Sequence, residues 1–128
     1  RLKISSSYIS DPHLQFMSAN SLGKDDVVVA ISQSGTTAAL IESIKIVRKN
    51  GAKVIGIMPG DTPLANICDF PLTINVGSNN RISKPVTSRI AYTAVIDVLT
   101  MGVAQLKPEA QDHLYNIADS QRSLKVDN

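Results

Sequence analysis

The stretch from residue 27 to residue 37 constrains the fold of this chain most strongly. It reads Val-Val-Val-Ala-Ile-Ser-Gln-Ser-Gly-Thr-Thr, an apolar run that continues into a turn rich in hydroxyl groups. Consecutive valines are typical of a central parallel strand, and the apolar residues after the turn recur at helical spacing. These residues are Leu40, Ile41, Ile44 and Val47. The stretch therefore predicts a buried strand, a tight turn and a helix from about residue 37 to residue 50.

The turn in this stretch offers the donors that an anion requires. In open parallel sheets, ligands bind at the carboxyl ends of the strands, and the first turn of the following helix has unpaired N–H groups. Gln33 adds an amide, and Gly35 lets the backbone approach a ligand closely. Hydroxyl groups come from Ser32, Ser34, Thr36 and Thr37. A single hydroxyl would suffice to cap the helix, so the pattern favours a phosphate monoester site over a simple cap.

The rest of the chain alternates strands with helices. Alternation of this kind implies right-handed crossovers and a parallel sheet covered on both faces. We therefore expect an α/β fold, a doubly wound parallel sheet. The expected elements are strands over 2–4, 53–58 and 70–76, a helix from residue 11, a helical turn near 65–67, a helix over 86–106, and a last helix from about residue 109.

The composition limits the partners that the chain is able to bind. Its 128 residues, with a mass of 13.7 kDa and 43% hydrophobic content, suit one domain over residues 1–128. The net charge is only +2 and the basic residues are dispersed, which argues against nucleic-acid binding by this chain alone. No apolar run approaches the roughly 18–20 residues of a membrane span. We expect a cytoplasmic protein that makes no membrane contact.

The residues suited to metal, redox or nucleotide chemistry are few. Cys68 has no second cysteine to pair with and suits a reducing compartment, so we interpret it as a small buried residue rather than a nucleophile. No group of His, Cys, Asp or Glu has the spacing of metal ligands. Neither glycine-rich nucleotide motif, GxxxxGK[ST] or GxGxxG, occurs. We expect neither a metal nor a cofactor.

The long helix expected over 86–106 has an apolar arc too wide for one face of a sheet. Its apolar positions are Ile90, Ala91, Ala94, Val95, Val98, Leu99, Gly102 and Val103. We expect one side to pack on the sheet and the other on a second subunit, which predicts self-association into a dimer. The alternative is a helix sandwiched between the sheet and the last helix.

Residues 32–37 resemble the S-x-S-G-x-T signature of the SIS, or sugar isomerase, domain. A wider pattern is similar to the effector domain of RpiR/MurR-type transcription regulators, and it covers nearly the whole chain. The resemblance implies the SIS fold, a flavodoxin-like three-layer sandwich, from which the first strand and helix of the family are missing here. The wider pattern comprises Ser10–Gln15, Gly23–Val29, Asn50–Ile55, Ser88–Ala91 and Ala94–Leu99.

The resemblance also implies a ligand and a role. A phosphosugar would bind the domain and change how an amino-terminal helix-turn-helix domain binds operator DNA. His13 would reach the sugar from the preceding helix. The phosphate would be held by Ser32, Gln33, Ser34 and Thr37. The helix-turn-helix domain is missing from this sequence, so we expect a fragment of a longer regulator that binds DNA only through that domain.

Two site candidates have more than one interpretation. By its spacing alone, His13 is a solvated or capping residue next to a helix start, whereas the resemblance favours contact with the ligand. Arg89 follows the last strand together with Arg81 and Lys84. These cations either add positive charge at the edge of the sheet that faces the ligand or are simply exposed.

Two classes of function remain, a sensor and an aldose–ketose phosphate isomerase. The isomerase reaction moves a proton between adjacent carbons and needs a carboxylate base beside the sugar. The glutamates, Glu42 and Glu109, and Asp97 in the long helix all lie away from the expected position. We therefore expect a non-enzymatic sensor of a hexose or amino-sugar phosphate.

Overall fold

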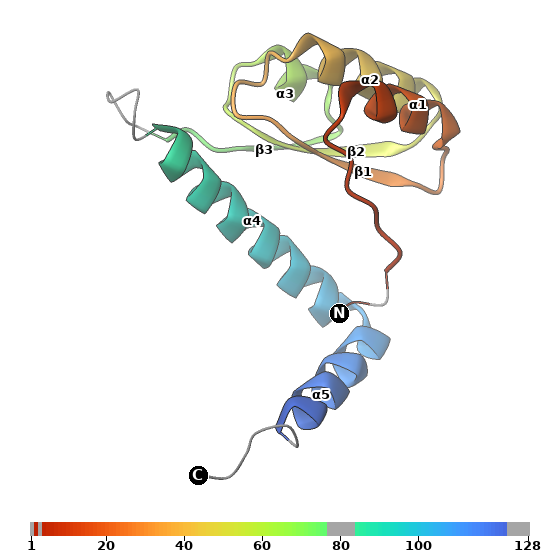
Figure 1. The fold of residues 1–128 in the computed structure, drawn as a ribbon, viewed down its shortest axis with the longest axis vertical. Coiled ribbons are helices and arrows are strands. Elements are labelled where there is room, and N and C mark those ends of the chain that lie inside the picture. The colour runs from red at the N-terminus through yellow and green to blue at the C-terminus, as the bar shows by residue number, and fades with distance from the viewer. Residues whose placement is uncertain (1, 3, 77–83, 123–128) are drawn as a thin grey trace. The chain divides into compact units, whose positions relative to one another are not determined.

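The computed structural model describes residue 2 and residues 4–76 and 84–122. They form two compact units, one over Tyr8–Tyr92 and the other made of residues 93–122 and the described residues before Tyr8. The elements in chain order are α1 (Pro12–Ser21), β1 (Val27–Ile31), α2 (Ala38–Lys49), β2 (Lys53–Met58), α3 (Pro63–Ile67), β3 (Phe70–Thr73), α4 (Lys84–Leu106) and α5 (Pro108–Arg122) (Figure 1).

The three strands form one parallel sheet in the order β1-β2-β3. Val27 pairs with Lys53 and Ile55 pairs with Phe70, so the strands run in register from one edge to the other. The prediction of a parallel α/β fold is confirmed. The third strand ends at Thr73 rather than at residue 76, and residues 77–83, which follow it, lie outside the described residues.

The helices α1, α2 and α3 lie on one side of this sheet (Figure 1). Helix α2 packs on β1 and β2, and α1 packs on α2. The predicted ends of α2 are correct to within a residue, because Gly51 follows the helix at φ +91°, a left-handed conformation that favours glycine. The core under these helices contains Ala30, Ile44, Val47, Val54, Met58 and Leu64.

The opposite face of β1 carries apolar side chains that remain exposed. Val27, Val29 and Ile31 are 62%, 48% and 46% exposed, because alternate residues of a strand point to opposite faces. Strand β1 is also an edge of the described sheet. The strand expected over 2–4 is wrong at Leu2 and Ile4, which belong to no strand, and Lys3 lies outside the described residues. A segment of three residues has too few ladder hydrogen bonds to order itself.

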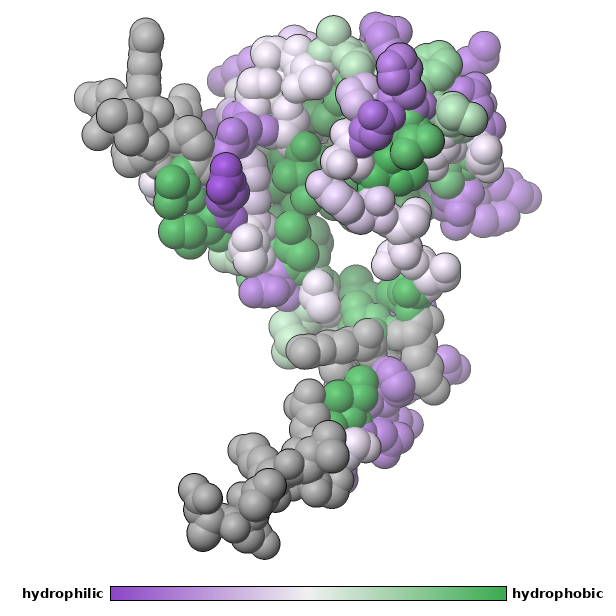
Figure 2. Space-filling model, in the orientation of Figure 1, coloured by the Kyte–Doolittle hydropathy of each residue, from purple (hydrophilic) through white to green (hydrophobic). Residues whose placement is uncertain are grey.

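The unit after Tyr92 contains most of α4 and all of α5. Apolar side chains along α4 reach the surface (Figure 2), and Val98, Met101 and Leu106 are 71%, 57% and 85% exposed. Within the described residues, Val86–Leu106 is long and apolar enough to cross a membrane by length and composition alone, with a mean hydropathy of 1.2. The expectation that no apolar run reaches this length is therefore wrong. Core helices of soluble proteins pass the same test.

Candidate functional site

The candidate site is the turn between β1 and α2, at the carboxyl edge of the sheet. Strand β1 ends at Ile31 and helix α2 begins at Ala38, so the turn contains the whole segment 32–37. Gly35 adopts φ +64°, in the left-handed region that favours glycine. The structure thus brings six of the eight predicted site residues into one short loop: Ser32, Gln33, Ser34, Gly35, Thr36 and Thr37.

Ser32 anchors the turn to the framework of the sheet. It is 7% exposed, and its backbone N–H donates to the Ile57 carbonyl of β2 at 3.0 Å. Its hydroxyl oxygen accepts the Gly35 N–H at 3.0 Å, and its carbonyl accepts the Tyr92 hydroxyl at 3.4 Å. Burial raises the pKa of Tyr92, so this phenol stays protonated and remains a donor at neutral pH. Ser32 is therefore a structural member of the turn as well as a candidate ligand.

Two backbone amides of the turn are already satisfied by its own serines. Ser32 accepts the N–H of Gly35, and the exposed Ser34 accepts the N–H of Thr36 at 3.2 Å through its side-chain oxygen. A hydroxyl that accepts in this way keeps its own proton for a second partner. These two amides are therefore not the donors for an anion, whereas the serine hydroxyls still are.

The open donors lie instead in the first turn of α2. Thr37 is the N-cap residue, and its side chain makes no capping hydrogen bond. The first N–H of the helical ladder to find a partner is that of Ile41, which donates to the Thr37 carbonyl at 3.0 Å. The N–H groups of Ala38, Ala39 and Leu40 precede it and have no partner inside the helix. With the exposed hydroxyls of the turn, they present a group of donors suited to a small anion.

Sequence reasoning missed Thr62, which lies against the turn. This residue is the N-cap of α3 and is 8% exposed. Its side chain occupies the space that a Cβ atom on Gly35 would need, and the Leu64 N–H donates to the Gly35 carbonyl at 3.1 Å. The Thr-Pro pair at 62–63 signals the start of a helix, but no sequence pattern indicates that this start meets Gly35.

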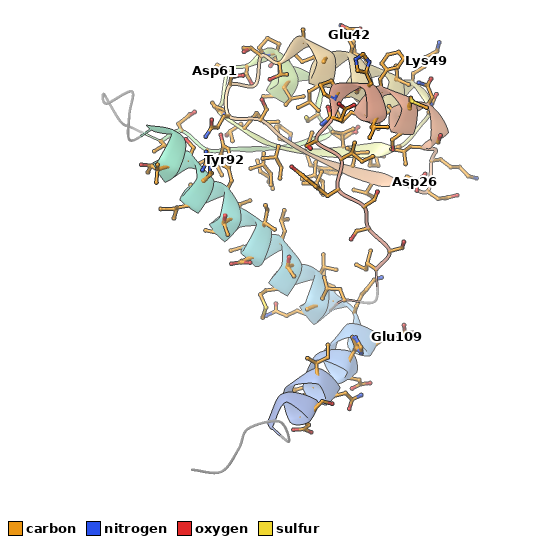
Figure 3. The ribbon with its side chains drawn as sticks, in the orientation of Figure 1. Asp26, Glu42, Lys49, Asp61, Tyr92 and Glu109 are labelled. Atoms are coloured by element: carbon orange, nitrogen blue, oxygen red, sulfur yellow. The ribbon has the colours of Figure 1, made fainter. Side chains whose placement is uncertain are left out.

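Sequence reasoning also missed Asp61, because what distinguishes it is its backbone conformation. It is the only described residue other than glycine with a positive φ, at +55°, and its side chain is exposed. Figure 3 shows Asp61 and Tyr92 near the carboxyl end of the sheet and Asp26 at the opposite end. Asp61 thus places a carboxylate in the loop after β2, on the same edge as the β1–α2 turn.

The structure places the two remaining predicted site residues outside the turn. His13 is exposed in the first turn of α1, where its backbone N–H donates to the Asp11 carboxylate at 3.0 Å. In the described part of the chain, no hydrogen bond joins the His13 side chain to the turn. Arg89 is exposed on α4, Arg81 lies outside the described residues, and the contribution of both to a ligand site stays a prediction.

The other titratable groups of the described residues do not form a second centre. Burial raises the pKa of Cys68, and to a smaller extent the Arg48 charge lowers it and the Asp69 carboxylate raises it. Glu42 forms an exposed ion pair with Lys45 at 2.7 Å. Across the described ranges, no group of three or more His, Cys, Asp and Glu side chains is placed to hold a metal ion.

Taken together, the parallel sheet and the hydroxyl-rich turn that leads into an open helix N-terminus define an α/β domain whose first βα loop carries open donors. The SIS domain family model matches residues 3–102, and the chain belongs to this family. The resemblance found from residues 32–37 is thereby confirmed.

Relatives agree with this assignment, and a solved structure shares the fold. The chain is 34% identical over 121 residues to the HTH-type transcriptional regulator HexR of Escherichia coli K12, a match that covers 94% of this chain and 42% of HexR. It is 35% identical to HexR of Pseudomonas aeruginosa, over the same shares of the two chains. The Vibrio vulnificus NanR protein complexed with ManNAc-6P matches with a TM-score of 0.75 and 22% identity, over 93% of this chain and 46% of NanR. The chain spans less than half the length of HexR.

Proposed function

We propose that this chain is the effector domain of a transcription regulator and binds a sugar phosphate without converting it. The observation that carries the proposal is the uncapped N-terminus of α2, bordered by exposed hydroxyl groups. Its relative HexR is a transcriptional regulator, and NanR, which shares the fold, has been solved with a phosphorylated amino sugar. Both support a sensor, and the longer relatives support a separate DNA-binding part in a cytoplasmic protein.

The phosphate would lie at the first turn of α2. There it accepts from the N–H groups of Ala38 to Leu40 and from the hydroxyls of Ser34, Thr36 and Thr37. Contacts to a helix terminus and charge-assisted hydrogen bonds are each worth on the order of 1–2 kcal/mol. These contacts bind any phosphate monoester, so the sugar has to be recognised by other groups. Candidates are Asp61, at the same edge of the sheet, and His13 on the preceding helix.

A signal would leave the site through Ser32 and Tyr92. The hydrogen bond between the Ser32 carbonyl and the Tyr92 hydroxyl joins the turn directly to α4. A change in the turn on binding therefore changes a contact of this helix. The usual coupling energy in such regulation is about 1–3 kcal/mol. Self-association through the apolar side of α4 belongs to the same proposal, since a dimer would pass a shift in α4 to its partner.

The competing function is a sugar-phosphate isomerase. That reaction needs a carboxylate close to the sugar. Asp61 is the candidate that the structure adds, since it lies in the loop at the carboxyl end of β2. Glu42 is less suitable, because it is exposed and paired with Lys45. In the described part of the chain no acid is paired with Asp61, which supports hydrogen bonding to a sugar hydroxyl or amine better than turnover.

One set of measurements separates these functions. The chain is titrated calorimetrically with glucose 6-phosphate, glucosamine 6-phosphate, N-acetylmannosamine 6-phosphate and inorganic phosphate, and with the unphosphorylated sugars as controls. We expect at least one sugar phosphate to bind and its unphosphorylated sugar not to bind. Proton NMR of the same mixtures is expected to show no new sugar after prolonged incubation. Conversion of a ligand would establish the isomerase, and absence of binding by every phosphate would refute the sensor.

A further inference from the structure

The loop between β2 and α3 lies against the most constrained point of the phosphate turn. A Cβ atom on Gly35 would lie 2.5 Å from the Thr62 Cβ and 2.7 Å from its Cγ2, and closer still to its Oγ1. Gly35 also has a φ of +64°. Glycine is therefore required here twice, once by the backbone and once because the Thr62 side chain fills the adjacent space.

The Thr62 side chain is itself held in place from two directions. Its hydroxyl donates to the Pro59 carbonyl at 3.1 Å and accepts the Ala65 N–H at 3.3 Å as the N-cap of α3. The next turn of backbone adds a direct link, since the Leu64 N–H donates to the Gly35 carbonyl at 3.1 Å. Thr62 is 8% exposed, so solvent does not compete for these bonds. The start of α3 is thus held in place and restricts the position of Gly35.

Gly35 in turn sets the geometry of the donors around it. Its N–H is bound by the Ser32 hydroxyl, and the residue after it donates to Ser34. A movement of Gly35 would therefore reorient the hydroxyls of Ser32 and Ser34 and the first residues of α2. Gly35 is thus the one residue between Thr62 and the groups that would donate hydrogen bonds to the anion.

We propose that Thr62 is a positioning residue for the phosphate site. It holds Gly35 and, through it, the hydroxyls and the first turn of α2 in the arrangement that accepts a phosphate. Thr62 acts through Gly35 rather than by touching the ligand. This inference rests on the proposed function, because it assigns a role within the same site.

The test uses Thr62→Gly, which removes the three side-chain atoms that border Gly35. Glycine is an acceptable N-cap, so helix α3 is expected to form. We expect the dissociation constant for the sugar phosphate that the wild type binds best to rise about threefold to tenfold. The matched control is Asp69→Asn, at the opposite end of α3, where the carboxylate accepts the Val54 N–H at 2.9 Å. The control is expected to lower thermal stability and leave the affinity unchanged.

A double-mutant cycle then tests whether Thr62 acts through Gly35. Gly35→Ala alone is expected to weaken binding by roughly a hundredfold, since its new Cβ meets Thr62 and its φ is unfavourable. Thr62→Gly removes the atoms that this Cβ would meet. The double variant is therefore expected to bind at least about threefold more tightly than Gly35→Ala. Additive losses in the double variant would overturn the inference.

A measurement without ligand separates this inference from the proposed function. The backbone amide resonances of residues 34–39 are compared by NMR in the ligand-free wild type, Thr62→Gly and Asp69→Asn. We expect Thr62→Gly to shift them and Asp69→Asn to leave them in place. Unchanged amides in Thr62→Gly would overturn the positioning role whether or not a ligand binds. A wild type that binds no sugar phosphate would refute the proposed function, and the amide shifts would still decide whether Thr62 positions the turn.

Discussion

At the scale of single residues, the site depends on hydroxyls with two tasks. Ser32 and Ser34 accept backbone amides of their own turn and still have a proton to donate to a ligand. Ser34 is exposed and Ser32 is buried, so Ser34 is the better probe of ligand binding. Removing it tests the site without opening the core.

Ser34→Ala is expected to weaken binding of a sugar phosphate about tenfold. The lost hydrogen bond to a charged phosphate is worth about 1.5–3 kcal/mol, and part of that is recovered by water. Ser43→Ala is the matched control, because its hydroxyl donates to the Ala39 carbonyl inside α2. Calorimetric titration of both variants checks the prediction. Equal affinities for Ser34→Ala and the wild type would show that this hydroxyl makes no contact with the ligand.

Cys68 is expected to react slowly with alkylating reagents near neutral pH. Burial raises its pKa above the ordinary value of 9.0, so little thiolate is present at neutral pH and the fraction grows only as the pH rises through the raised value. The rate of carbamidomethylation, followed by mass spectrometry against pH, should reach half its maximum above pH 9.0. The urea-unfolded chain serves as the control. A folded-state midpoint below that of the unfolded chain would contradict the prediction.

At the scale of elements, the ends of the helices are set by local chemistry. The Asp11 carboxylate caps α1 by accepting the N–H groups of His13 and Leu14, both at 3.0 Å, and Pro12 follows at the first helical position. Helix α2 differs, because its N-cap side chain makes no such bond. Among α1, α2 and α3, the helix whose start stays open is the one that begins at the candidate site.

Asp11→Ala is expected to lower the free energy of unfolding by about 1 kcal/mol, since two amides of α1 lose their acceptor. Urea denaturation followed by circular dichroism measures the change. Asp25→Ala is the control: Asp25 is exposed in the turn before β1, and its loss is expected to change stability by less than about 0.5 kcal/mol. A similar effect of both substitutions would mean that the cap is not formed in solution.

At the scale of the whole molecule, the described chain leaves unusual apolar surface uncovered. Alternate residues of β1 are exposed on the face away from α2. Several apolar residues of α4 are exposed as well. An exposed strand edge and a broad apolar helix both favour association with another chain or with further parts of a longer protein. The chain matches less than half of HexR, which agrees with contacts to further parts of a longer protein. Association with another chain is compatible with the same match.

Val98→Glu is expected to reduce self-association of this chain. Val98 is 71% exposed on α4, so a carboxylate there does not disturb a core but would be desolvated in an interface. Sedimentation velocity over a range of concentrations compares it with the wild type. Asn116→Glu on α5 adds the same charge at an exposed polar position and is expected to have no effect. A wild type that stays monomeric at every concentration would refute association through α4.

The sequence alone determined the features that depend on neighbours along the chain. The start of α1 near residue 11, both ends of α2 and the strand of consecutive valines were predicted correctly to within a residue. Capping, left-handed turns and β-propensity act over a few residues, so a local pattern is enough to reveal them. The same local rules identified the turn over 32–37 and explain why Gly35 must be glycine in its backbone conformation.

Only the tertiary structure decided what depends on residues far apart in the chain. It placed Thr62 against Gly35 and Tyr92 on the Ser32 carbonyl, contacts between segments separated by tens of residues. It also ended β3 early and left residues 2 and 4 outside any strand, because a strand requires a partner and not only a propensity. Packing and pairing are properties of the folded chain, so no local pattern could supply them.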